Sequence, residues 1–102
     1  MNPDQFNSLL AKDKTVQLID VRTPGEYAGG HIAGSTNIDY NAPDFLDRMR
    51  KLDKNKPVAL YCAVGGRSGN AAVKLKELGF SKIYDLAGGT QAWAANKLPL
   101  VK

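Results

Sequence analysis

The sequence has 102 residues, of which 43% are hydrophobic and 24% are charged. This is the composition of an average folded globular protein, so we expect neither disorder nor a second catalytic domain. The net charge of +4 comes from 14 basic and 10 acidic residues that are mixed along the chain, so no nucleic-acid partner is expected. The longest apolar run, residues 58–64, is too short to cross a membrane. We expect one domain over residues 1–102, as a monomer or weak dimer.

The chain contains one Cys and one His, too few for a structural zinc site or for a disulfide within the chain. We therefore expect no metal. Residues 1–4 are polar and acidic, unlike the basic and apolar start of a signal peptide. The expectation is a cytoplasmic protein, with export after removal of a signal segment as the alternative.

The first third of the chain predicts two short helices on either side of a buried strand. A helix is expected from Asn2, which is followed by Pro3 and by apolar residues at helical spacing. Residues 16–21 are mostly apolar and include three β-branched residues, which predicts a buried strand. In the next segment Thr23 and Glu26 form a capping box around a proline, which predicts a very short second helix.

The rest of the sequence alternates between strands and helices. We expect a short strand at 36–38, a helix opening at Pro43, a central strand at 58–62, a helix after the turn 63–67 with Gly79 as its C-cap, a strand at 83–86 and a last helix after Gly89. Such alternation predicts βαβ units. The expected fold is therefore α/β, with a central, mainly parallel sheet of four to five strands and helices on both faces.

Cys62 ends the predicted central strand and begins a turn that contains two glycines. Ligands of parallel α/β proteins bind at the carboxyl ends of the strands, and Gly65 and Gly66 allow successive N–H groups to face inward. These amides, the start of the next helix and Arg67 all favour a thiolate. We expect the pKa of Cys62 to fall from ~8.5 to ~6.5, which needs about 2.7 kcal/mol of thiolate stabilisation.

A lone cysteine at the end of a core strand is more often a small buried hydrophobic residue. A chemical role is favoured here by the whole combination of strand, cysteine, two glycines, arginine, a serine able to cap, and helix. The candidate site is catalytic Cys62 with a binding loop formed by Ala63, Val64, Gly65, Gly66, Arg67 and Ser68.

These residues resemble the single-domain rhodanese-like sulfurtransferases, and the resemblance runs nearly from end to end. It is carried by Leu18–Arg22, Glu26-Tyr27, Gly30–Ile38, Tyr61–Ser68 and Leu86–Gly89 with Trp93. The resemblance implies a small α/β fold in which Cys62 accepts a sulfane sulfur as a persulfide. A small sulfur-containing anion such as thiosulfate, or a persulfide, would be the donor, and a thiol or cyanide the acceptor. No metal or organic cofactor is implied.

Two other functions are kept as alternatives. A rhodanese-like module can bind an anion or a partner protein, or carry sulfur, without catalysis, and an unshifted pKa of Cys62 would support that reading. Phosphatases and arsenate reductases with a similar loop have five residues between Cys and Arg, whereas Cys62 and Arg67 are separated by four. The shorter loop favours a thiolate carrying one extra sulfur over a tetrahedral phosphate.

One departure from the family concerns the donor. Relatives that prefer thiosulfate often carry cations directly after the cysteine, whereas Ala63 and Val64 are apolar and Arg67 is the only charge of the loop. We therefore expect thiosulfate to be a poor donor, with a persulfide or another sulfur compound preferred.

Asp20 and Arg22 are expected to support the loop. Because they lie at a strand end, we expect their side chains to diverge and to form separate salt bridges, with Arg22 adding positive potential near the site. Glu26 is expected to act only as a helix cap.

The remaining residues are expected to be structural. His31 is expected to belong to the loop scaffold, because a thiolate already stabilised by its surroundings needs no general base. Gly88 and Gly89 are expected to permit tight backbone packing near the loop, and Trp93 is expected to pack in the core or at its rim.

Overall fold

A computed structural model describes residues 1–102 of the chain. It contains a four-stranded, fully parallel sheet in the order β2-β1-β3-β4. The strands are β1 (Gln17–Asp20), β2 (Thr36–Asn37), β3 (Val58–Tyr61) and β4 (Ile83–Asp85). The helices are α1 (Pro3–Lys12), α2 (Pro24–Ala28), α3 (Phe45–Arg50), α4 (Gly66–Glu77) and α5 (Gly89–Ala95). The expected α/β fold with a parallel sheet is confirmed.

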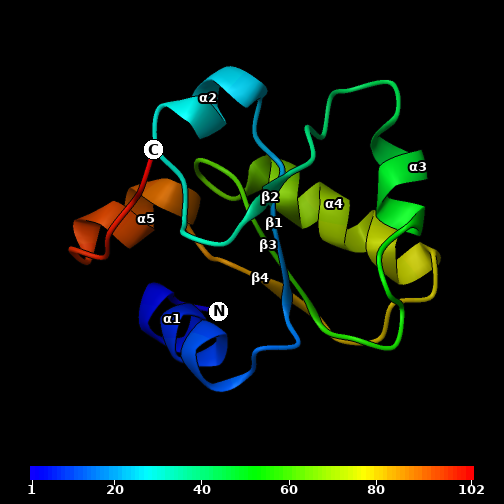
Figure 1. Cartoon of the computed structure of the whole chain (residues 1–102), viewed down its shortest axis with the longest axis horizontal. Helices are drawn as coiled ribbons and strands as arrows, with labels where there is room; N and C mark the ends of the chain where they lie inside the picture. Colours follow the sequence, from blue (N-terminus) through cyan, green and yellow to red (C-terminus); the bar gives the residue numbers. More distant parts are fainter.

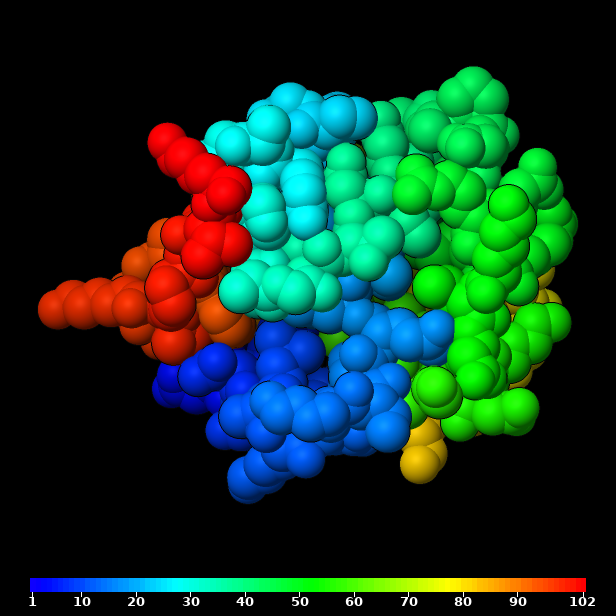
Figure 2. Space-filling view, in the orientation of Figure 1, coloured from blue at the N-terminus to red at the C-terminus, as the bar shows by residue number.

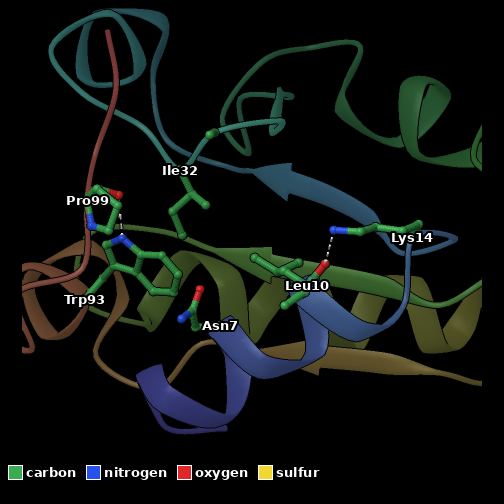
Figure 3. A pocket seen from close by; sticks show the side chains of 8 residues that line it. Asn7, Leu10, Lys14, Ile32, Trp93 and Pro99 are labelled. Atoms are coloured by element: carbon green, nitrogen blue, oxygen red, sulfur yellow. Dashed lines mark hydrogen bonds between the residues drawn. The ribbon is translucent and has the colours of Figure 1, made fainter.

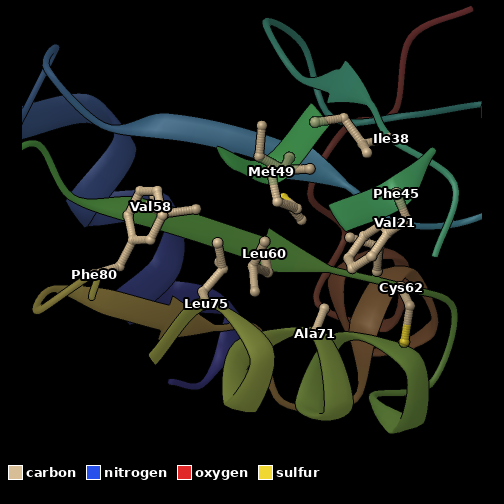
Figure 4. Packing of buried hydrophobic residues seen from close by; sticks show 11 residues of the cluster. Val21, Ile38, Phe45, Met49, Val58, Leu60, Cys62, Ala71, Leu75 and Phe80 are labelled. Carbon is tan, nitrogen blue, oxygen red and sulfur yellow. The ribbon is translucent and has the colours of Figure 1, made fainter. Parts of the chain in front are cut away.

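Helices cover both faces of the sheet (Figure 1). On one face, α3 and α4 pack against the strands through an apolar cluster that includes Met49, Leu60 and Leu75 (Figure 4). On the other face, α1 and α5 contribute Phe6 and Trp93, whose rings meet edge to face with centroids 6.3 Å apart. Because both faces are covered, β3 is buried along its whole length. Trp93 is 2% exposed and belongs to the apolar cluster on this second face, so it is a core residue.

The two predicted N-terminal caps are both formed. The side chain of Asn2 accepts a hydrogen bond from the N–H of Gln5 at 2.8 Å, and the side chain of Gln5 accepts one from the N–H of Asn2 at 3.0 Å. Thr23 and Glu26 make the same reciprocal pair at the start of α2, at 3.1 and 3.3 Å. Each pair satisfies two N–H groups that have no partner within the helix.

Some helix ends differ from the expectation by one or two residues. α3 begins at Phe45 because Pro43 lies in a turn, which Phe45 closes by donating its N–H to the carbonyl of Ala42 at 3.1 Å. The C-cap of α4 is Leu78, and Gly79 follows it with a φ of +99°.

None of the helices combines the length and the apolar character needed to cross a membrane.

The C-terminal segment lies against the loop that follows α2 (Figure 2). The N–H of His31 donates to the carbonyl of Val101, and the N–H of Val101 donates to the carbonyl of His31, both at 2.8 Å. The His31 ring stacks on Tyr27, with centroids 3.8 Å apart, and its Nδ1 lies 2.9 Å from the Tyr27 carbonyl. These contacts give His31 the scaffold role expected of it.

Replacement of Leu60 by alanine tests how much the core cluster contributes to stability. Leu60 is 0% exposed, so Leu60→Ala leaves a cavity and should lower the free energy of unfolding by about 2–5 kcal/mol. Leu46→Ala is the matched control, because Leu46 is 38% exposed on α3, and should change this free energy by no more than about 0.5 kcal/mol. Urea denaturation measures both, and equal losses would contradict the layer arrangement.

Candidate active site

Side chains from three strands meet at the carboxyl edge of the sheet. Cys62 follows β3 directly, Asp20 ends β1 and Asp85 ends β4. The strands are parallel, and the register pairs Asp20 with Tyr61 and Leu60 with Asp85. The three side chains therefore lie at neighbouring strand ends, which is where parallel α/β sheets bind their ligands.

The loop after Cys62 is held by the first turn of α5. The carbonyl oxygens of Cys62 and Ala63 accept hydrogen bonds from the N–H groups of Thr90 and Gln91, at 2.9 and 3.1 Å. N–H groups in the first turn of a helix have no partner within the helix, so they are available to bind the loop. As a result the first two loop carbonyls point toward α5.

The sulfur of Cys62 accepts a hydrogen bond from the N–H of Gly65, with an N···S distance of 3.0 Å. Gly65 has a φ of +112°, which lies in the left-handed region that favours glycine. Burial raises the pKa of the Cys62 thiol, but the nearby polar groups of Ser68 and the N–H groups of Gly65 and Val64 outweigh the effect of burial. The pKa of Cys62 is therefore lowered, the direction expected from the sequence.

Cys62 is also part of the apolar core. It is 0% exposed and belongs to the cluster that contains Val21 and Ala71 (Figure 4). The loop beside it is only partly covered, since Val64 is 60% exposed. The same side chain thus has the burial of a core cysteine and the N–H partners of a reactive one.

Arg67 binds Glu26 and makes no hydrogen bond to the sulfur. Its two terminal nitrogens donate to the two carboxylate oxygens of Glu26 at 2.7 and 2.9 Å, which lowers the pKa of Glu26 to about 2. The charge of Arg67 still attracts a thiolate at Cys62, but the carboxylate offsets it. The expectation that Glu26 acts only as a helix cap is wrong, because this contact joins residues 41 positions apart.

Asp20 and Arg22 bind each other, so the expectation that their side chains diverge is also wrong. The Nε of Arg22 lies 3.1 Å from both carboxylate oxygens of Asp20, and a terminal nitrogen lies 2.7 Å from one of them. Residues two positions apart along an extended chain point to the same side. Both side chains are buried, and Arg22 also donates to the carbonyl of Gly30 at 2.6 Å. Arg22 therefore fixes the chain after α2, and its charge is neutralised.

Ser68 does not cap α4, contrary to expectation. The N-cap is Gly65, with no capping hydrogen bond from a side chain, and Ser68 lies in the first turn of the helix. Its hydroxyl donates to Oδ1 of Asp85 at 2.6 Å. Asp85 is a residue that the sequence reasoning missed, although its place at the end of a predicted strand, at the same sheet edge as Cys62, is a signal that could have identified it.

The largest surface hollow lies elsewhere. It has a volume of about 290 Å³ and is lined from α1, α5, two loops and the C-terminal segment by Asn7, Leu10, Ala11, Lys14, Ile32, Ala33, Trp93 and Pro99 (Figure 3). None of these residues belongs to the Cys62 loop.

No group of three or more His, Cys, Asp or Glu side chains is placed to hold a metal ion.

Gly89 packs directly on the backbone of the Cys62 loop, as expected for the glycine pair. A Cβ atom added at Gly89 would collide with the carbonyl oxygen of Cys62 and would lie 2.6 Å from that of Ala63. Gly89 also has a φ of +57°. No side chain fits between α5 and the loop, so the contact that orients the loop carbonyls depends on glycine.

Gly89→Ala should both destabilise the protein and disturb the sulfur. Overpacking and a left-handed alanine together should lower the free energy of unfolding by about 2–4 kcal/mol. Displacement of the loop should also change the rate at which iodoacetamide alkylates Cys62. Gly25→Ala is the control, because no atom lies within 4 Å of a Cβ added there. If the two variants matched in stability and alkylation rate, the close approach would not constrain the loop.

Comparison with known proteins shows which family the chain resembles in sequence. Residues 2–96 match the sequence model of the Rhodanese-like domain. The thiosulfate sulfurtransferase GlpE of Pseudomonas entomophila is 36% identical over 94 residues, covering 91% of this chain and 82% of that protein. The uncharacterized protein YqhL of Bacillus subtilis is 44% identical over 80 residues, covering 78% of this chain and 62% of that protein.

A solved structure extends the similarity to the fold. The rhodanese-related protein of Thermoplasma volcanium superposes with a TM-score of 0.87 at 33% identity, covering 99% of this chain and 95% of that one. Sequence and fold agree over almost the whole length of the chain. The chain therefore belongs to the rhodanese-like domain family, whose members include sulfurtransferases.

Proposed function

We propose that this protein is a rhodanese-type sulfurtransferase that carries sulfur as a persulfide on Cys62. The thiolate of Cys62 attacks the outer sulfur of a donor, and the bond between that sulfur and the rest of the donor breaks. The leaving group, such as sulfite or a thiolate, departs with the bonding electrons. An acceptor thiolate or cyanide then attacks the outer sulfur of the persulfide, and Cys62 leaves as a thiolate again.

The observation that carries this proposal is the hydrogen bond from the N–H of Gly65 to the Cys62 sulfur, at 3.0 Å. The thiolate is the nucleophilic form of cysteine, and N–H groups already oriented toward the sulfur stabilise it without reorganisation. Gly65, Val64 and Ser68 also lower the pKa of Cys62, and we propose that they stabilise the negative charge when it moves to an added sulfur. They therefore suit both the free thiolate and the persulfide anion.

Access to the sulfur requires the loop to open. Cys62 is 0% exposed, so we propose that a donor reaches it through a movement of the loop that keeps the N–H of Gly65 at the sulfur. Gly65 and Gly66 give this segment more backbone freedom than other residues would. The loop is short and anchored by α5, so we propose that the opening is local.

The persulfide is tested by intact-mass measurement after exposure to thiosulfate and, separately, to an alkyl persulfide. The protein should gain the mass of one sulfur atom, and dithiothreitol should remove it. Cys62→Ser should gain none, because Cys62 is the only cysteine of the chain. The proposal is contradicted if neither donor adds sulfur to the wild-type protein, or if the Cys62→Ser variant gains as much.

Charge pairing at the site supports a donor other than thiosulfate. Arg67 is bound by Glu26 through two hydrogen bonds, and Arg22 is bound by Asp20. Neither guanidinium offers an uncompensated charge to a dianion such as thiosulfate. We therefore propose that the preferred donor is a persulfide, which carries less charge, and that Glu26 contributes to this preference.

Glu26→Gln tests the role of this charge pairing in donor choice. Glutamine can keep the capping box of α2 but removes the negative charge, so the positive charge of Arg67 becomes available to the donor. The kcat/KM for thiosulfate should rise about tenfold, which corresponds to about 1.4 kcal/mol. The kcat/KM for an alkyl persulfide should change much less.

The control is Glu77→Gln, which removes one exposed negative charge at the far end of α4. It should leave the ratio of the two kcat/KM values unchanged. If Glu26→Gln also leaves the ratio unchanged, Glu26 has no part in donor choice.

A further inference from the structure

The surface hollow beside α1 is a candidate ligand site that the proposed sulfur transfer does not use. Its volume of about 290 Å³ is close to the lower end of the range of roughly 300–1,000 Å³ that is typical of small-molecule sites. Four parts of the chain enclose it (Figure 3): α1, the loop after α2 with Ile32, α5 with Trp93, and the C-terminal segment with Pro99. The hollow is therefore a product of the packed fold.

A smaller hollow of about 150 Å³ adjoins the first one. Leu10, Lys14 and Ala33 line both hollows. The two hollows therefore form one groove between α1 and the loop after α2, which we call the α1 groove. Lys14 lies where they join, so a ligand in either part meets this side chain.

The larger hollow has an apolar wall that the fold holds in place. The Nε1 of Trp93 donates to the carbonyl of Pro99 at 2.8 Å, and the Trp93 ring meets Phe6 edge to face. The N–H of Ile32 donates to the hydroxyl of Tyr61 at 3.0 Å. Trp93 and Ile32 are 2% and 3% exposed, so their side chains are already ordered. A preformed wall of this kind lowers the entropy cost of binding a ligand.

One charged side chain lines the larger hollow. Lys14 takes part in no ion pair, and its Nζ donates to the carbonyl of Leu10 at 3.4 Å. The neighbouring Asp13 lines only the smaller hollow, and its carboxylate accepts the N–H and the hydroxyl of Thr15 at 2.9 and 2.6 Å. Asn7 points its neutral amide into the larger hollow (Figure 3). This hollow thus contains one cation and no carboxylate.

We propose that the α1 groove binds a small molecule that has an apolar body and one carboxylate. The apolar body lies against Trp93 and Ile32, and the carboxylate pairs with the ammonium group of Lys14. A neutral apolar molecule leaves this ammonium group without a partner, and a dianion brings a second charge that no lining residue matches. Inorganic anions lack the apolar surface that the wall can bury.

The groove fits a small molecule better than a protein partner. A protein interface covers about 800 Å² on each side and needs apolar anchors near its centre. The large apolar side chains that the chain exposes do not line the larger hollow; they are Met1, Leu46, Val64, Val73, Leu100 and Val101. The apolar surface here lies inside the hollow, where a compact ligand reaches it.

Trp93 is the only tryptophan of the chain, so its fluorescence reports directly on this groove. The probe is 4-phenylbutanoate, which should change the emission saturably with a Kd on the order of 1 mM. The matched neutral probe, 4-phenylbutan-1-ol, should bind about fivefold more weakly because it lacks the charge. Butanoate, which lacks the ring, should cause no saturable change. The absence of a saturable change with 4-phenylbutanoate, or equal affinities for the carboxylate and the alcohol, would overturn the proposal.

A charge variant and its matched control assign the preference for a carboxylate to Lys14. Lys14→Gln should weaken the binding of 4-phenylbutanoate about fivefold and leave the affinity for the alcohol unchanged. Lys12→Gln should change neither affinity, because Lys12 is exposed on α1 and lines neither hollow. Equal effects of the two variants on 4-phenylbutanoate would show a general charge effect and contradict the assigned site.

A filling variant tests the hollow itself. Ala11 is exposed on α1 and lines the larger hollow, so the longer side chain of Ala11→Leu should occupy it. Alanine and leucine both favour helices, so α1 should be kept. Both aromatic probes should bind about tenfold more weakly, which corresponds to about 1.4 kcal/mol. Unchanged affinities in this variant would place the probes outside the hollow.

Two measurements without any substitution separate this groove from the Cys62 loop. Protein alkylated at Cys62 with iodoacetamide should bind 4-phenylbutanoate as tightly as unmodified protein. In the unmodified protein, the probe should move the amide NMR signals of Leu10, Lys14 and Ala33 more than those of residues 62–68. Loss of binding after alkylation, or shifts confined to residues 62–68, would overturn the proposal. Neither measurement uses a sulfur donor, so the outcome is independent of the test of the Cys62 persulfide.

Discussion

The hydrogen bond from the N–H of Gly65 to the sulfur of Cys62 is possible only because the chain reverses within a few residues between β3 and α4. That reversal requires a left-handed residue, which is Gly65 at φ +112°. It also requires the preceding carbonyls to be held elsewhere, and the first turn of α5 does this through Thr90 and Gln91. Backbone N–H groups at the starts of α4 and α5 therefore fix the position of the Cys62 sulfur.

The electrostatics of the site depend more on backbone N–H groups and hydrogen bonds than on free cations. Both nearby arginines are bound by carboxylates, Arg67 by Glu26 and Arg22 by Asp20. An ion pair of this kind holds neighbouring segments in register while contributing little net charge. The N–H groups and the Ser68 hydroxyl then outweigh the effect of burial on the pKa of Cys62. Such a site stabilises a thiolate nucleophile without the net positive charge that would attract anions in general.

Local features of the structure could be predicted well from the sequence. The capping boxes at Asn2 and Thr23, the buried strand before Cys62 and the parallel sheet each follow from short patterns of residue type and spacing. The contacts of Glu26 and Asp85 could not be found in this way, because their partners lie 41 and 17 positions away and only the packed fold brings them together. The prediction that the side chains of Asp20 and Arg22 diverge is wrong for another reason. The two-residue period of an extended chain already places these two side chains on the same side.

The surroundings of Cys62 stabilise its thiolate, so that Cys62 loses its proton more readily than a free cysteine does. Because the chain has a single cysteine, a ¹³Cβ-labelled cysteine reports on this sulfur alone in an NMR pH titration of the unmodified protein. We predict a midpoint below the ordinary cysteine value of ~8.5. A midpoint at or above that value, as burial alone would produce, would contradict it.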